Sequence, residues 1–143
     1  MIAQHFQVPQ NGLMEMDSRT ARLILAARSC LISRNAKQDP LPRIREYLRS
    51  AAVATRFALL MDVVQQIWPD PFGIHRPCCP NASLDEALLG KAVDLAIFDQ
   101  RPAFDLLLHE MLGTDARDVF FARARNLYGD FDQEEKATAL GRR

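Results

Sequence analysis

One short segment of the chain gathers side chains that commonly bind metals. His75, Cys78 and Cys79 lie within residues 75–80, and His75 and Cys78 have an i, i+3 spacing. Two thiolates and an imidazole can bind zinc or copper(I). Structural zinc sites take four ligands, and adjacent cysteines seldom both reach one ion. A fourth ligand would have to come from His5, His109, Cys30 or a carboxylate.

The same two cysteines have a simpler interpretation. Cys78 and Cys79 are flanked by Pro77 and Pro80, and free cysteine often behaves as a small apolar side chain. In this interpretation the thiols pack a proline-rich loop against the protein and bind nothing. A disulfide between the adjacent cysteines would instead make the loop responsive to thiols. The sequence leaves these alternatives open.

Other catalytic motifs are incomplete. His109-Glu110 begins a zinc-protease motif, but the second histidine of that motif would fall at position 113, which is Gly. The chain has neither a serine in a nucleophile elbow nor a glycine-rich phosphate loop. The carboxylate pair Asp85-Glu86 suits the electrostatics of a helix start. We therefore expect no enzymatic activity, no catalytic residue and no cofactor, zinc or copper(I) being the alternative.

Residues 106–127 can be compared with a helix-turn-helix that has Gly113 in its turn. Arg117, Arg123 and Arg125 would then lie on the recognition helix. Two acidic residues, Asp115 and Asp118, stand near the start of that helix, where they would repel phosphates. The sequence therefore disfavours nucleic acid as a partner.

Composition and charge describe an ordinary globular domain. The 143 residues are 48% hydrophobic and 25% charged, and 18 basic residues balance 18 acidic ones. Residues 1–68 carry nine basic and five acidic residues, a balance of +4, and the remainder carries −4. The halves either attract each other within one fold or leave a basic face on the first half. The longest nearly apolar run, residues 51–64, is too short and too charged to cross a membrane.

Neither a signal peptide nor a lipidation motif is recognisable at the amino terminus. We therefore expect a cytoplasmic protein whose cysteines are reduced thiols.

Apolar periodicity predicts an all-α, single-domain bundle of about five helices. The expected helices span residues 18–35, 42–67, 84–100, 103–112 and 114–128. Residues 1–16 are expected to form an irregular arm, residues 17–129 the helical domain and residues 130–143 a charged tail. Asp17 or Ser18 caps the first helix, and Ser83 with Glu86 forms a capping box for the third. Gly113 is expected to end the fourth helix.

The second expected helix is apolar on nearly all sides, which predicts a central position with neighbours around it. Its small residues either allow close approach of another helix or mark a bend; they are Ser50, Ala51, Ala52 and Ala54. Asp62 interrupts its apolar run. Either Asp62 lies on a narrow exposed seam, or an arginine from another helix, such as Arg28 or Arg22, pairs with it. For the third helix the spacing predicts an inward face of Leu84, Leu88, Ala92, Leu95 and Ala96.

A Pro- and Cys-rich loop, residues 68–82, separates the second and third expected helices. The segment Trp68-Pro69-Asp70-Pro71-Phe72-Gly73 stops the preceding helix, and the loop contains four prolines. A loop of this length is uncommon in a compact domain and often functional. The loop is therefore the first place to look for a site.

Three segments resemble a family of small uncharacterised alphaproteobacterial helical proteins, a domain of unknown function with a Cys-Cys-Pro loop. They are Arg76-Pro77-Cys78-Cys79-Pro80, Leu84-Asp85-Glu86-Ala87-Leu88-Leu89 and Arg101-Pro102-Ala103-Phe104. The similarity covers most of residues 20–113. It implies a bacterial helical protein and supplies no reaction, cofactor or catalytic residue.

The leading hypothesis is a non-enzymatic cytoplasmic helical protein that binds a protein partner or a second copy of itself. Several apolar helix faces are wider than one neighbour needs, which is typical of an interaction protein. The alternative is a metal- or thiol-responsive module that uses His75, Cys78 and Cys79. A weaker alternative is a nucleic-acid-binding regulator that uses the basic first half.

Overall fold

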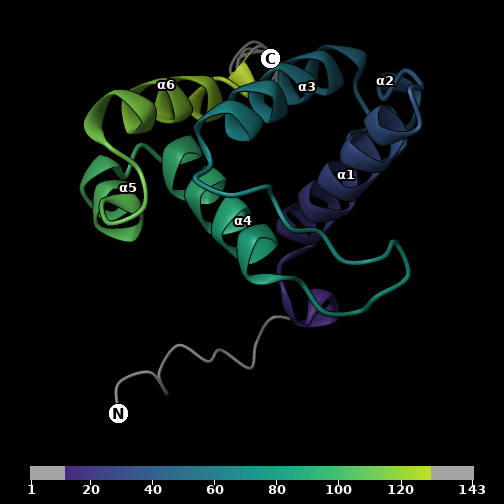
Figure 1. The fold of residues 1–143 in the computed structure, drawn as a ribbon, viewed down its shortest axis with the longest axis horizontal. Coiled ribbons are helices and arrows are strands. Elements are labelled where there is room, and N and C mark those ends of the chain that lie inside the picture. The colour runs from purple at the N-terminus through teal and green to yellow at the C-terminus, as the bar shows by residue number, and fades with distance from the viewer. Residues whose placement is uncertain (1–11, 130–143) are drawn as a thin grey trace, which may run out of the picture.

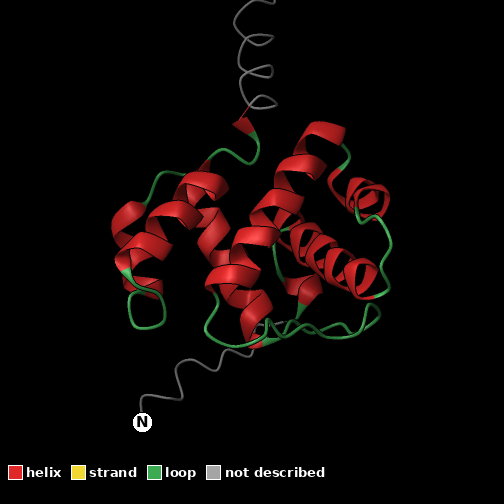
Figure 2. Cartoon of the chain, turned by 45° about the horizontal axis from the view of Figure 1, so that its top comes forward, coloured by secondary structure: helices red, strands yellow, loops and turns green. Residues whose placement is uncertain are grey.

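The computed structural model describes residues 12–129, and this part of the chain forms a single all-α domain without strands (Figures 1 and 2). Its helices are α1 (Ser18–Asn35), α2 (Leu41–Leu48), α3 (Ala51–Ile67), α4 (Leu84–Ile97), α5 (Arg101–Leu108) and α6 (Thr114–Arg125). The predicted all-helical bundle is confirmed. Most of the predicted arm, and the tail of residues 130–143, lie outside the described residues. The end of the arm forms a short 3-10 turn, η3 (Leu13–Glu15).

The start of α1 follows the sequence prediction. Asp17 is the N-cap, and its carboxylate accepts from the Arg19 amide at 2.9 Å and from the Thr20 hydroxyl at 2.8 Å. The hydrogen bond from Thr20 lowers the pKa of Asp17 below its ordinary value. A charged cap at this end of a helix also suits the positive end of the helix dipole.

The single helix expected over residues 42–67 is wrong, because the backbone turns between α2 and α3. Arg49 adopts a left-handed conformation with φ 63°, and Ser50 then caps α3 by accepting from the Val53 amide at 3.2 Å. A serine N-cap offers the backbone an alternative to continuing the helix. The second part, α3, contacts α1, α2 and α6, as a central helix should.

The aromatic core joins α3 to α5 and α6. Trp68 contacts Phe72 and Phe120 with ring centroids 5.2 Å and 6.1 Å apart. Phe104 contacts Phe120 at 5.4 Å and Phe121 at 5.0 Å, both in edge-to-face geometry. Such tilted contacts are the favourable ones for aromatic pairs. The start of the loop after α3 is therefore held in place by α6.

The inward face of α4 differs from the prediction. Leu84 is 71% exposed, whereas Glu86, Leu89 and Val93 are buried. Ala92 and Ala96 face inward as expected. Glu86, which the predicted face places outward, instead points into the protein and pairs with the buried Arg28. An apolar stripe cannot reveal such a pair.

The role predicted for Gly113 is also wrong. The helix α5 ends at Leu108, and Gly113 is the N-cap of α6 rather than the cap that ends α5. Residues 109–112 form a turn that still buries Leu112. The buried leucine continued the apolar spacing past the true end of the helix, which explains the error.

Helices α1 and α4 approach closely at Gly90. A Cβ atom added there would lie 2.9 Å from the Thr20 methyl group, closer than ordinary contacts allow. The missing side chain therefore lets α4 lie against α1; Figure 1 shows the two helices as neighbours. In the described residues, no helix is long and apolar enough to cross a membrane.

Candidate functional site

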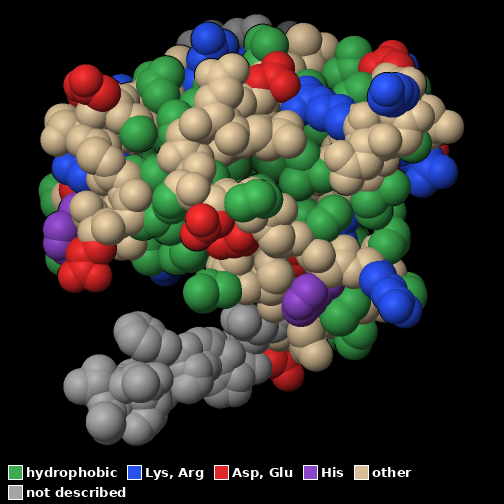
Figure 3. Space-filling model, viewed as in Figure 1, with side chains coloured by type: hydrophobic (Ala, Val, Ile, Leu, Met, Phe, Trp, Pro, Cys, Tyr) green, Lys and Arg blue, Asp and Glu red, His purple; other side chains and the backbone are tan. Residues whose placement is uncertain are grey.

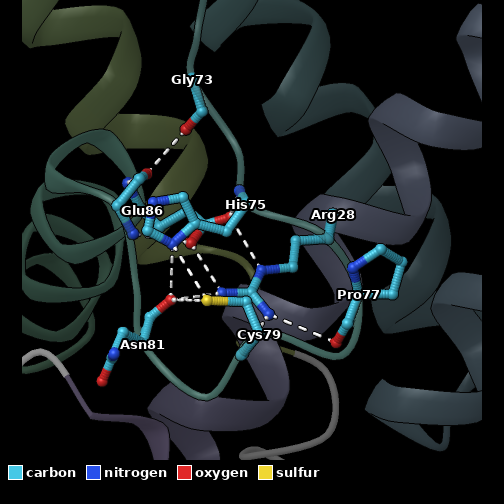
Figure 4. A network of polar contacts seen from close by, with 8 residues as sticks. Arg28, Gly73, His75, Pro77, Cys79, Asn81 and Glu86 are labelled. Carbon is cyan, nitrogen blue, oxygen red and sulfur yellow. Dashed lines mark hydrogen bonds and ion pairs between the residues drawn. The ribbon is translucent and has the colours of Figure 1, made fainter.

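The connection between α3 and α4 is the loop that the sequence singles out, hereafter the Cys-Pro loop (residues 68–82). It begins at Trp68, whose extended backbone ends α3, and it reaches α4 at the Ser83 N-cap. Figure 4 shows the polar contacts that hold it. Trp68, Phe72 and Ile74 pack against the core, whereas residues 75–81 are exposed or half-buried and are held by the polar contacts.

A buried arginine of α1 organises the loop. The Arg28 side chain is 1% exposed, and it donates from Nε to Glu86 Oε2 at 2.9 Å and from Nη2 to Glu86 Oε1 at 3.0 Å. The same guanidinium donates to the carbonyl oxygens of Cys79 at 2.9 Å, Asn81 at 2.9 Å and Pro77 at 3.4 Å. The planar fork of arginine suits such a set of acceptors. One side chain therefore binds both α4 and three points of the loop.

Glu86 completes the arrangement from the side of α4. Its Oε1 accepts from the Ser83 amide at 2.9 Å, and Ser83 Oγ accepts from the Glu86 amide at 3.0 Å. Its Oε2 also accepts from the His75 amide at 3.0 Å. The predicted capping box is confirmed. Each carboxylate oxygen thus has two donors, which a buried charge requires.

His75 and Cys79 meet within the loop, as Figure 4 shows. His75 Nδ1 lies 2.7 Å from the Asn81 carbonyl oxygen and 3.5 Å from Cys79 Sγ. Because a carbonyl oxygen only accepts hydrogen bonds, Nδ1 must carry the proton in this contact. A neutral imidazole in that tautomer keeps its lone pair on Nε2, the arrangement that metal-binding histidines commonly use.

The structure does not bring Cys78 to the other two predicted ligands. Cys78 is exposed, Cys79 is half-buried, and both are free thiols. Over residues 12–129 no group of three His, Cys, Asp or Glu side chains is placed to hold a metal ion. The third cysteine, Cys30, is buried, and burial raises its pKa to about 11.

The chain before α1 lies against the far side of the loop. The Leu13 amide donates to the Pro80 carbonyl oxygen at 2.7 Å, and Gly12 and Asn81 form an isolated antiparallel bridge. Asn81 therefore contacts both Arg28 and the residues before α1. No sequence pattern predicts the contact between residues 12–13 and the loop, because it joins segments about 70 residues apart.

Both alternatives for Asp62 hold: the exposed seam is confirmed, and an arginine from another helix pairs with it, although it is neither Arg28 nor Arg22. Asp62 is about half-exposed and forms an ion pair with Arg34 of α1, whose Nη1 lies 2.8 Å from Asp62 Oδ1. Arg28, one of the two candidates, pairs with Glu86 instead. Sequence reasoning recognised Glu86 as a cap and missed it as the partner of Arg28. The available signal was an arginine on the buried stripe of α1, one turn from Ile24 and Leu31.

The residues compared with a helix-turn-helix form a second polar cluster between α5 and α6. Arg117 donates to Asp105 at 2.8 Å and to the Leu112 carbonyl oxygen at 2.6 Å. Arg101 donates to Asp105 at 3.0 Å and to Asp118 at 2.7 Å. Arg117 and Asp118, which that comparison places on the recognition helix, therefore form their hydrogen bonds within this chain. His109 is exposed, as expected.

Comparison of the chain with family models, curated proteins and solved structures found no significant match.

Proposed function

We propose that this protein is a non-enzymatic, cytoplasmic binding protein that recognises a protein partner through its Cys-Pro loop. The observation that carries the proposal is the buried Arg28–Glu86 pair, which holds an exposed loop by three of its carbonyl oxygens. A second copy of the chain is one form that the partner can take.

The physical support is preorganisation. Ordering a loop when it binds costs conformational entropy, and a loop that is already ordered avoids this cost. Here Arg28 is the donor that orders residues 77–81, while Arg76, Pro77, Cys78 and Pro80 remain exposed. Buried ion pairs contribute little net stability compared with apolar packing. A buried pair used to shape an exposed loop therefore favours a role for the loop surface.

The exposed thiol offers a direct test. In a Cys79→Ser variant, a maleimide photo-crosslinker attached to Cys78 should capture a protein or a second copy from lysate of the source cells. The control carries the label on α3, in a Cys78→Ser/Cys79→Ser/Gln66→Cys variant, because Gln66 is exposed and outside the loop. Unlabelled wild-type protein should compete for the captured partner.

A second variant separates loop recognition from chance proximity. Arg76 and Pro77 are exposed and their side chains make none of the contacts described above. Arg76→Glu/Pro77→Ala should therefore leave the thermal melting temperature unchanged and reduce capture. Capture of the same proteins from Cys78 and from Cys at position 66 would overturn the proposal.

A metal- or thiol-responsive module is the second candidate, because one specific contact favours it. The Asn81 carbonyl oxygen at 2.7 Å sets the His75 tautomer, and Cys79 Sγ lies 3.5 Å from the same ring. In this candidate His75 Nε2 and the thiolates of Cys78 and Cys79 bind zinc or copper(I) after the loop rearranges.

Native mass spectrometry of the reduced protein tests this candidate. Zinc or copper(I) should add with 1:1 stoichiometry to the wild type and to Cys30→Ser, whose missing thiol is buried. The adduct should be lost from Cys78→Ser/Cys79→Ser. Equal metal binding by all three proteins would exclude the loop as the site. The same spectra report the number of subunits.

A further inference from the structure

Basic side chains gather around α2, on a surface separate from the Cys-Pro loop. Residues 34–56 contain six basic and two acidic residues, a net charge of +4. This equals the whole positive excess of residues 1–68. Figure 3 shows Lys and Arg side chains over the part of the surface where Figure 1 places α2.

Four of these cations are exposed and form no ion pair with another described residue, namely Lys37, Arg43, Arg45 and Arg49. By contrast, Arg28, Arg101 and Arg117 each bind a carboxylate of this chain. The cations around α2 are therefore available to an external anion.

Two of the four occupy backbone positions that do not suit them. Lys37 has φ 61° and Arg49 has φ 63°, both in the left-handed region. Glycine adopts this conformation readily, whereas a side chain makes it costly. One such residue stands on each side of α2. The chain thus keeps a basic side chain at two positions where glycine would be more stable.

An apolar groove has one of these cations, Arg45, in its lining. It has a volume of about 250 Å³ and is formed where α2 and α3 begin. Its lining consists of Asp39, Leu41, Pro42, Arg45, Ala51, Ala54 and Thr55. The volume suits one bulky apolar side chain, and Arg45 stands where it can bind a neighbouring carboxylate.

We infer that this groove binds an acidic peptide segment of a partner protein, with one bulky apolar side chain in the groove and carboxylates on the surrounding cations. Charge complementarity selects the partner, since arginine binds carboxylates with paired hydrogen bonds. The groove lining has no aromatic side chain on which a nucleic-acid base could stack, so a peptide fits better than single-stranded nucleic acid. The surface is distinct from the loop of the proposed function.

Fluorescence anisotropy with the full chain tests the inference. The probe is a labelled peptide of four glutamates and a central phenylalanine. One control peptide replaces glutamate with glutamine, a second replaces phenylalanine with alanine, and oligothymidylate represents nucleic acid. The glutamate–phenylalanine peptide should bind, should weaken with salt, and should bind at least about tenfold more tightly than either control peptide.

Glycine variants separate binding from folding. Arg49→Gly and Lys37→Gly should keep or raise the melting temperature, because glycine adopts the left-handed conformation without strain. Each should lower the affinity for the labelled peptide about tenfold. Asp99→Gly is the matched control, since Asp99 also has a positive φ, 58°, but is acidic and lies after α4. This variant should raise the melting temperature without lowering the affinity for the labelled peptide.

Several results would overturn the inference. These are no binding of the glutamate–phenylalanine peptide, equal binding of the glutamine control, or unchanged affinity in Arg49→Gly and Arg45→Ala. Tighter binding of oligothymidylate than of the peptide would assign the surface to nucleic acid instead.

Discussion

The molecule contains two arginine–carboxylate networks whose surroundings differ. Arg28 and Glu86 are 1% and 0% exposed, and their pair joins α1, α4 and the Cys-Pro loop. Arg101, Asp105, Arg117 and Asp118 form a partly exposed cluster between α5 and α6. The first network shapes the exposed part of the loop, residues 75–81, whereas the second lies over the rings of Phe104 and Phe121 in the aromatic core.

The comparison teaches that burial, more than the number of hydrogen bonds, sets the importance of a polar network. A buried charge that loses its partner is left without compensation, whereas an exposed charge returns to water. The predictions below test this difference.

The largest effect is expected from Arg28→Met. The substitution leaves the buried Glu86 carboxylate without a counter-charge and three loop carbonyl oxygens without their Arg28 donor, and should lower the free energy of unfolding by about 3–5 kcal/mol. Urea unfolding followed by circular dichroism measures it. Arg22→Met, on the same helix but only partly buried, should change stability by less than about 0.5 kcal/mol. Equal effects of the two substitutions would refute the assigned role of the buried pair.

A smaller effect is expected where α1 and α4 approach. Gly90→Ala places a Cβ atom 2.9 Å from the Thr20 methyl group and forces apart the helices that hold Arg28 and Glu86. We expect a loss of about 1–3 kcal/mol from overpacking, although alanine favours a helix by up to about 1 kcal/mol. Thermal and urea unfolding measure the change.

Thr20→Ser provides the control for Gly90→Ala. Serine keeps the hydroxyl that donates to Asp17 and removes the methyl group. In that background Gly90→Ala should become neutral or stabilising. A loss that persists in Thr20→Ser would show that the close approach is not the cause.

Substitutions in the exposed cluster between α5 and α6 should change stability only slightly, and the size of the change should depend on pH and salt. Partial burial raises the pKa of Asp105, but hydrogen bonds from Arg117 and Arg101 outweigh this and hold it below its ordinary value. A carboxyl whose pKa is lower in the folded state stabilises the fold at pH values above its unfolded-state pKa, about 3.9. This contribution is lost as the pH falls through the folded-state pKa.

Asp105→Asn should therefore cost only about 0.2–1 kcal/mol at neutral pH, and less at high salt. The difference between wild type and variant should shrink as pH falls below about 4. Urea unfolding across pH measures it. A difference that stays constant down to pH 2 would contradict the role of the Asp105 carboxylate.

The smallest effect of a substitution is expected for Asp105→Asn on the reaction rates of the three thiols. Cys78 is exposed and should react first with a chromogenic disulfide, Cys79 more slowly, and Cys30 only on unfolding, because it is buried and its pKa is raised to about 11. The rates should change little in Asp105→Asn, which lies far from the loop in the chain. Rapid reaction of Cys30 in the folded protein would contradict its burial.

Sequence reasoning succeeded where the cause was local. The Asp17 cap, the Ser83–Glu86 capping box and the stop at Trp68-Pro69 were each read from a few neighbouring residues. It offered the break at Arg49 only as a possible bend at the small residues from Ser50, because a left-handed arginine has no sequence signature and the apolar pattern continues across it. It failed on Leu84 because the capping carboxylate turned inward.

The sequence by itself determined an all-α chain, the starts of most helices and the position of the Cys-Pro loop. Caps, prolines and apolar periodicity act over a few residues, so they can be read without knowing the fold. Only the tertiary structure decided that Arg28 meets Glu86, which lies 58 residues away, and that His75 contacts Cys79 and Asn81 within the loop. Which buried charges pair depends on how α1 and α4 pack, and that packing depends on all the helices together.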